Sequence, residues 1–128
     1  MTYDDASWHQ DTTEDYGLAE SASVTHIVAF FAWANRVGIL ASGQDRAIAA
    51  LADRTVSVEE FADTYIDWQI DPLMLTERGN WFAETHYGDF LQSLEGSQLV
   101  RGKRSMYDLP STWDTVDAIA PVLDELYR

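Results

Sequence analysis

The sequence predicts a single all-α domain of four to six helices, and three observations lead to this prediction. Apolar residues recur at helical spacing in several segments. Polar residues that can cap a helix precede these segments. The chain has 128 residues, of which 46% are hydrophobic and five are tryptophan, so it can bury a full core without disulfides. We therefore expect residues 1–128 to form one domain.

The clearest helix is expected at residues 22–37, in the centre of the fold. Its apolar residues follow the i, i+3, i+4, i+7 rule at Val24, Ile27, Val28 and Phe31. Ser21 or Ser23 can cap its start, and Gly38 can end it in the left-handed conformation.

Further helices are expected along the rest of the chain. A short one covers residues 44–52, and a second begins with the capping box Ser57-x-x-Glu60 and ends near residue 68, before Asp71-Pro72. Another runs from Thr76 to about Gly96, weakened by Gly79 and Gly88. The last starts at Thr112, and Pro121 should kink or split it. The one expected departure from helix is a short strand or hairpin near residues 105–109.

Residues 1–20 are expected to form an irregular arm that packs on the helical body. Aromatic residues at Tyr3, Trp8 and Tyr16 favour packing over free movement. We expect Trp8 to cover the core, and His9 or His26 to bond the arm to the central helix. The buried set should include Ile27, Val28, Phe31, Phe61, Leu91 and Val116.

Charge is the strongest compositional signal. Asp and Glu total 22 against 8 Lys and Arg, which gives a net charge of −14. Such a surface repels nucleic acid and anionic lipid, so neither is an expected partner. Composition alone favours a high-GC or salt-adapted source as the reason for this acidity, because net charge mostly reports solubility; the alternative is a surface built to meet a basic partner. The absence of cysteine and of an apolar leader makes the cytoplasm the expected location.

Catalytic and cofactor motifs are missing, so we expect no cofactor and no metal. The sequence has no phosphate-binding loop, no dinucleotide fingerprint and no zinc-protease motif. His86 and Asp89 share a helix face at i, i+3, which predicts a surface hydrogen bond rather than a metal site. Acids at Asp11, Glu14 and Asp15 lack the offsets and the glycine of a calcium loop.

A row of acids on the third expected helix is the best candidate for a binding surface. Glu59 or Glu60 recurs with Asp63 and Asp67 at helical spacing, and no Lys or Arg within the helix relieves their repulsion. These four residues are called the acidic ridge below. Trp68 follows it directly and is the candidate anchor residue, with a position in the core as the equal alternative. The arm acids Asp11, Glu14 and Asp15 are a second candidate.

Several segments resemble a family of small uncharacterised acidic bacterial proteins. The resemblance lies in the opening Tyr-Asp-Asp-Ala-Ser-Trp-His, residues 3–9, in Thr25-His26-Ile27, in Phe31-Ala32-Trp33 and near Tyr107 and Thr112-Trp113. It implies a structural motif of Trp8, His9, His26 and Trp33, but no reaction. Small acidic families of this kind look like immunity proteins, which neutralise a cognate toxin.

Charge and resemblance together lead us to expect a protein-binding module rather than an enzyme. The expected function is that of an immunity-type inhibitor, which masks the active site of a basic toxin domain. One alternative is a small hydrolase that uses His9 and His26 with an arm carboxylate. A housekeeping structural protein is the other alternative.

Overall fold

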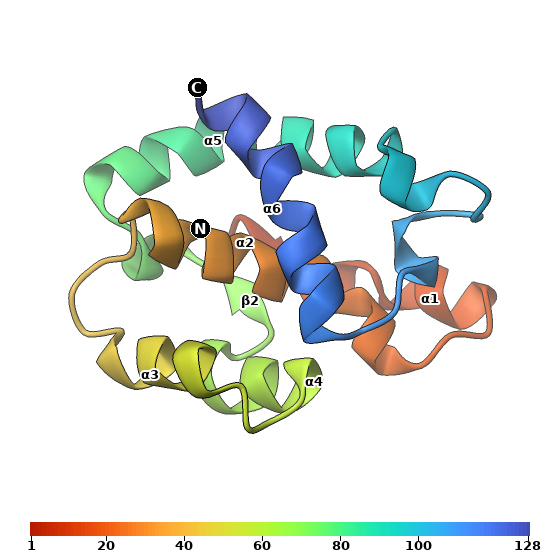
Figure 1. Ribbon diagram of the computed structural model, residues 1–128, viewed down its shortest axis with the longest axis horizontal. Coiled ribbons are helices and arrows are strands. Elements are labelled where there is room, and N and C mark those ends of the chain that lie inside the picture. Colours follow the sequence, from red (N-terminus) through yellow and green to blue (C-terminus); the bar gives the residue numbers. More distant parts are fainter.

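Helices make up most of the computed structural model, which describes residues 1–128 (Figure 1). The α-helices are α1 (Gln10–Asp15), α2 (Thr25–Val37), α3 (Asp45–Asp53), α4 (Val58–Phe61), α5 (Glu77–Glu95) and α6 (Trp113–Tyr127). Single 3-10 turns cover Ala6–Trp8, Glu20–Ser23, Pro72–Met74, Gln98–Val100 and Met106–Asp108. The all-α prediction is confirmed.

The central helix α2 packs against α6, which crosses it, while α5 lies on one side and α3 and α4 lie on the other (Figure 1). One hydrophobic core joins these helices, and its largest fully buried side chains include Trp33, Phe30 and Phe61. Of the six residues expected to be buried, five are; Leu91 is only partly covered.

Local capping signals locate most helix ends. The Ser57 side chain accepts from the backbone N–H of Glu60, and the Thr76 side chain accepts from Gly79. Gly38 ends α2 with a φ of 81°, in the left-handed region. Each capping interaction joins groups within a few residues of one another, so it can form independently of the tertiary structure. The start of α2 is the exception: neither Ser21 nor Ser23 caps it, and a 3-10 turn precedes Thr25.

Gly79 and Gly88 have different roles in α5. A Cβ atom at Gly79 would lie 2.8 Å from the carbonyl oxygen of Ile39, so the glycine permits a close approach between α5 and the segment after α2. A Cβ at Gly88 would meet nothing within 4 Å. Only Gly88 is therefore a plain cost to the helix.

One segment differs from the prediction, and one of the two alternatives for Pro121 is excluded. No strand forms at residues 105–109, where a 3-10 turn runs from Met106 to Asp108 with Ser105 capping it. Pro121 does not split α6, which is one helix from Trp113 to Tyr127, and the proline lies on its exposed side.

The strands that do form are β1 (Asp4–Asp5) and β2 (Gln69–Ile70), which pair antiparallel with Asp4 opposite Ile70. The pairing continues through the bond from the Ala6 N–H to the Trp68 carbonyl, 2.9 Å. This ribbon fixes the arm on the helical body, and it presents the side chain of Asp4 to the interior.

Candidate functional site

A buried carboxylate lies where the arm meets the helices. Asp4 is only 1% exposed, and its Oδ1 accepts from His9 Nε2 at 2.6 Å and from the N–H of Asp5 at 2.8 Å. Its Oδ2 accepts from His26 Nε2 at 2.9 Å and from the hydroxyl of Tyr87 at 2.6 Å. Four donors therefore surround one carboxylate, which is the satisfaction that a buried charge requires.

The donors fix the tautomers of the two histidines. An ionised carboxylate can only accept, so His9 and His26 each carry a proton on Nε2. In neutral His9 the Nδ1 atom is then an acceptor, and it takes the hydrogen bond from the hydroxyl of Tyr107. A continuous path of hydrogen bonds thus runs from Tyr107 through His9 to Asp4.

Burial and charge set the protonation states of the cluster. Burial raises the pKa of Asp4, but hydrogen bonds and charge from His26 and His9 outweigh burial, and the pKa ends below its usual range. Burial lowers the pKa of His26, and it raises that of Tyr87 well above the ordinary value. Burial, with the charges of Asp4 and Glu95, raises the pKa of Tyr107 to about 12. At neutral pH the Asp4 carboxylate is therefore ionised, while His26, Tyr87 and Tyr107 are neutral.

The arm, α2, α5 and the turn before α6 supply these side chains. Asp4 comes from β1, His9 follows the first 3-10 turn, and His26 lies in the first turn of α2. Tyr87 is in the middle of α5, and Tyr107 is in the turn before α6. His26 does bond the arm to the central helix. Asp4 and Tyr107 were noted only as part of the family resemblance, with no role in a site, and Tyr87 was not proposed as a site residue. A buried tyrosine hydroxyl that needs a partner is the signal that Tyr87 offered.

A hollow of about 390 Å³ opens beside the cluster. His9 and Tyr107 line it, together with Glu95 and residues of α5, whereas Asp4 and His26 do not. The side chain of His9 is 11% exposed and Tyr107 is half-buried, so the cluster reaches solvent through these two residues. A ligand in this hollow could contact the imidazole of His9 and the hydroxyl of Tyr107. The hollow does not join both histidines and the carboxylate of Asp4 in one pocket.

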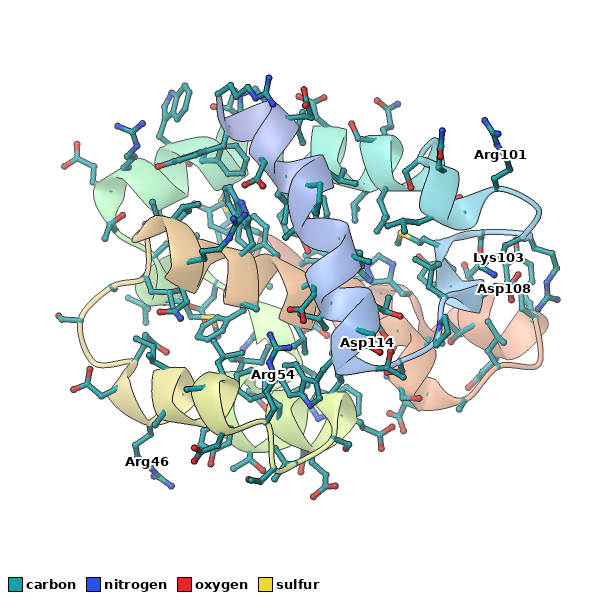
Figure 2. The ribbon with its side chains drawn as sticks, viewed as in Figure 1. Arg46, Arg54, Arg101, Lys103, Asp108 and Asp114 are labelled. Carbon is teal, nitrogen blue, oxygen red and sulfur yellow. The ribbon has the colours of Figure 1, made fainter.

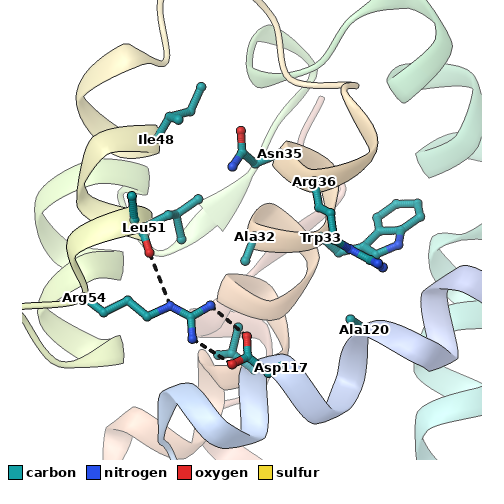
Figure 3. Close-up of a pocket in the computed structure, with 11 residues that line it drawn as sticks. Ala32, Trp33, Asn35, Arg36, Ile48, Leu51, Arg54, Asp117 and Ala120 are labelled. Atoms are coloured by element: carbon teal, nitrogen blue, oxygen red, sulfur yellow. Dashed lines mark hydrogen bonds and ion pairs between the residues drawn. The ribbon is translucent and has the colours of Figure 1, made fainter.

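A second hollow, of about 260 Å³, lies between α2, α3 and α6 (Figure 3). Both guanidinium Nη atoms of Arg54 bond the carboxylate of Asp117 at 2.7 Å, and Arg54 Nε donates to the carbonyl of Leu51. Trp33 is 1% exposed, and its indole N–H donates to Asp124 on α6. Trp33 thus ties α2 to α6 away from the Asp4 cluster.

The acidic ridge is exposed at all four of its residues. Glu59 and Glu60 lie in α4, Asp63 in a single π-helical turn (Ala62–Ile66) that continues α4, and Asp67 follows that turn. None of the four is in an ion pair. The helix ends two residues before the expected position, because Asp67 and Trp68 both have positive φ values, 52° and 61°.

Trp68 has the core position that was the alternative to an anchor role, whereas Trp8 is placed differently from the prediction. Trp68 is half-buried against the core, and its indole N–H donates to Asp63 at 2.9 Å. The expectation that Trp8 covers the core is wrong, since Trp8 is 61% exposed. The inward positions of this stretch are taken by Asp4 and Ala6, and the 3-10 turn then directs Trp8 to solvent.

The remaining candidates lie on the surface. Asp11, Glu14 and Asp15 are exposed on α1. His86 Nδ1 lies 3.1 Å from Asp89, which is the expected surface hydrogen bond. None of the helices combines the length and the apolar character that a membrane span requires.

Comparison with known proteins leads to a family rather than to a reaction. No curated protein and no solved structure matches the chain. The matched family model covers residues 2–108, a range that contains all five side chains of the Asp4 cluster and the whole acidic ridge. The protein therefore belongs to the family described as a domain of unknown function, DUF7832.

Proposed function

We propose that the protein is an acidic protein-binding module of the immunity type, which neutralises a basic bacterial toxin domain by masking its active site. The observation that carries the proposal is the acidic ridge, where Glu59, Glu60, Asp63 and Asp67 are exposed and free of ion pairs. Like charges at these spacings oppose the helix by a few tenths of a kcal/mol per pair. Folding offsets part of this repulsion, because Glu59 and Glu60 lie in the first turn of α4 and Asp63 accepts from the indole N–H of Trp68.

The basic residues leave the ridge unneutralised. Arg36, Arg54, Arg104 and Arg128 are each paired with an acid outside the ridge. Arg101 and Lys103 lie at the right of the view in Figure 2, away from α4 at its lower edge. Arg78 donates to the hydroxyl of Tyr127, and Arg46, on α3, is in no ion pair with the ridge. With a net charge of −14 around it, the ridge would attract a cationic partner and speed its association.

Trp8 replaces Trp68 as the candidate anchor residue. Ala6 donates its N–H to the carbonyl of Trp68, directly after the ridge, and Trp8 is two residues further on. The chain then enters α1, where the arm acids are exposed. An exposed indole beside two sets of acids suits an interface, because binding hot spots are enriched in tryptophan.

Inhibition would follow from the chemistry of the partner. A toxin that acts on nucleic acid must hold phosphates, so its active site is basic. Carboxylates on a folded inhibitor can occupy that surface in place of phosphates and close the site. The proposal needs no chemistry by the inhibitor itself.

The test begins with binding and protection. The protein should co-purify with the product of a neighbouring gene and protect cells that express it; if it does neither for any neighbour, the immunity function is wrong. Given a partner, the double change Glu59→Lys and Glu60→Lys should slow association about tenfold at low salt, and less at high salt.

A matched control separates the ridge from overall charge. The change Glu77→Lys with Glu84→Lys alters the net charge equally, on exposed positions that begin and follow the first turn of α5. Its effect on the association rate should be several times smaller. Equal effects from both pairs would place the interface away from the ridge.

One observation favours a hydrolase as the second candidate. Tyr107, His9 and Asp4 follow the order hydroxyl, imidazole, carboxylate, and the first two line a hollow. The raised pKa of Tyr107 disfavours it as a nucleophile. If the candidate is correct, a small activated ester should be cleaved by the protein and not by Tyr107→Phe. An equal rate for the two proteins would exclude it.

A further inference from the structure

We infer that Asp4, His9 and His26 bind one divalent transition-metal ion of the Zn²⁺ class. Each residue offers one ligand atom, and the three atoms lie within 4.8 Å of one another. Two imidazoles and one carboxylate form a donor set that Zn²⁺ accepts, and they leave a further coordination position for water. The inference is independent of the proposed binding function.

The two imidazole rings are arranged as ligands of one ion would be. Their centroids are 4.6 Å apart and their planes are at 81°. If an ion lies about 2.1 Å from each Nε2 and the Nε2–ion–Nε2 angle is between a right angle and the tetrahedral value, the two ring centroids are roughly 5 Å apart. Both Nε2 atoms already point to the same carboxylate, one to each oxygen. Binding therefore requires a small widening rather than a rearrangement.

The groups behind the ligands suit a metal site. The Tyr87 hydroxyl and the Asp5 N–H hold the carboxylate of Asp4 from the sides that the histidines leave free. Tyr107 contacts the other ring nitrogen of His9. When an ion replaces the proton on Nε2, that proton moves to Nδ1, and His9 then donates to the Tyr107 oxygen. Such outer partners orient the ligands of metal sites.

An ion can enter from the hollow that His9 lines. His9 is the outermost ligand, whereas Asp4 and His26 are almost fully enclosed. The net charge of −14 raises the local concentration of cations around the entrance. His86 and Asp89 provide an internal contrast, because they form an exposed pair without a third ligand.

The experiment is calorimetric titration of the chelator-treated full chain with ZnCl₂. One ion should bind per chain with a Kd below about 1 µM, and it should raise the Tm. His9→Gln removes a ligand and should weaken binding by at least about a hundredfold, more than the loss of an outer partner costs. The matched change His86→Gln should leave binding unaltered. Absence of binding, or equal binding by both variants, would overturn the inference.

A second measurement uses the unmodified chain, in case His9→Gln does not fold. In nitrogen-15 histidine spectra, Zn²⁺ should shift the ring signals of His9 and His26 together and leave those of His86 in place. If only the His86 signals move, the ion is held at the surface by exposed carboxylates, and the inference is wrong.

Discussion

The Asp4 cluster predicts a large effect for a nearly isosteric substitution, Asp4→Asn. The change keeps the size of the side chain, but it removes the buried charge and one of the two acceptor oxygens. Whichever way the amide turns, its NH₂ group faces an Nε2–H donor of His9 or His26. Two donors are therefore left without an acceptor, or must rearrange.

The magnitude follows from the bonds that are lost. A hydrogen bond to a charged group contributes about 1.5–3 kcal/mol, so two of them amount to roughly 3–6 kcal/mol. Part of this loss is recovered, since the uncharged amide is easier to bury and Tyr87 can turn its oxygen to accept from it. We expect the free energy of unfolding to fall by about 3 kcal/mol.

The assay is urea unfolding followed by circular dichroism, with a chelator present so that no bound ion contributes. A loss of about 3 kcal/mol lowers the midpoint by roughly 2 M urea for a domain of this size. Asp5→Asn is the control, because Asp5 accepts only from the N–H of Ser7 and Asn caps such turns equally well. If Asp4→Asn costs no more than Asp5→Asn, the four hydrogen bonds do not stabilise the arm, and the reasoning is wrong.

Four further substitutions test the backbone by the same unfolding assay. Gly79→Ala should lower the free energy of unfolding by about 1–3 kcal/mol, because the new Cβ would press on the Ile39 carbonyl. Gly88→Ala should raise it by up to about 1 kcal/mol, since its Cβ meets nothing within 4 Å. A change of the same sign at both positions would refute the close approach at Gly79. Asp67→Gly should leave stability unchanged or raise it by up to about 1 kcal/mol, since φ is 52°, and a clear loss would contradict this. Pro121→Ala should stabilise α6 by about 1 kcal/mol or more, because it restores a backbone donor at an exposed position; a lower midpoint would show that the ring is needed.

The sequence predicted the parts of the fold that depend on near neighbours. Ser57, Thr76 and Gly38 act on donors or carbonyls within four residues, so their roles follow from local chemistry. Strand β1 has only two residues, and no period of alternation can be recognised in so short a segment. The prediction for Trp8 was wrong because the exposure of its side chain depends on the pairing of β1 with β2, which joins residues far apart in sequence.

The candidate site was only half accessible from the sequence. His9 and His26 were singled out, and a carboxylate of the arm was expected beside them in one alternative. Which acid it is depends on the register of β1 against β2, where Asp4 and not Asp5 faces inward. Tyr107 joins the cluster across 98 residues, and no local pattern encodes such a contact.

The long reach of the arm also has a consequence for how the chain is made. Asp4 emerges from the ribosome before the other members of its cluster. Its carboxylate has all its donors only after Tyr87, 83 positions later, has been synthesised. Until then the arm carries a charge that the helices cannot yet accommodate, so docking belongs to the last phase of folding. A nascent chain stalled before Tyr87 should keep an arm that proteases can cut, and release of the full chain should abolish that cleavage.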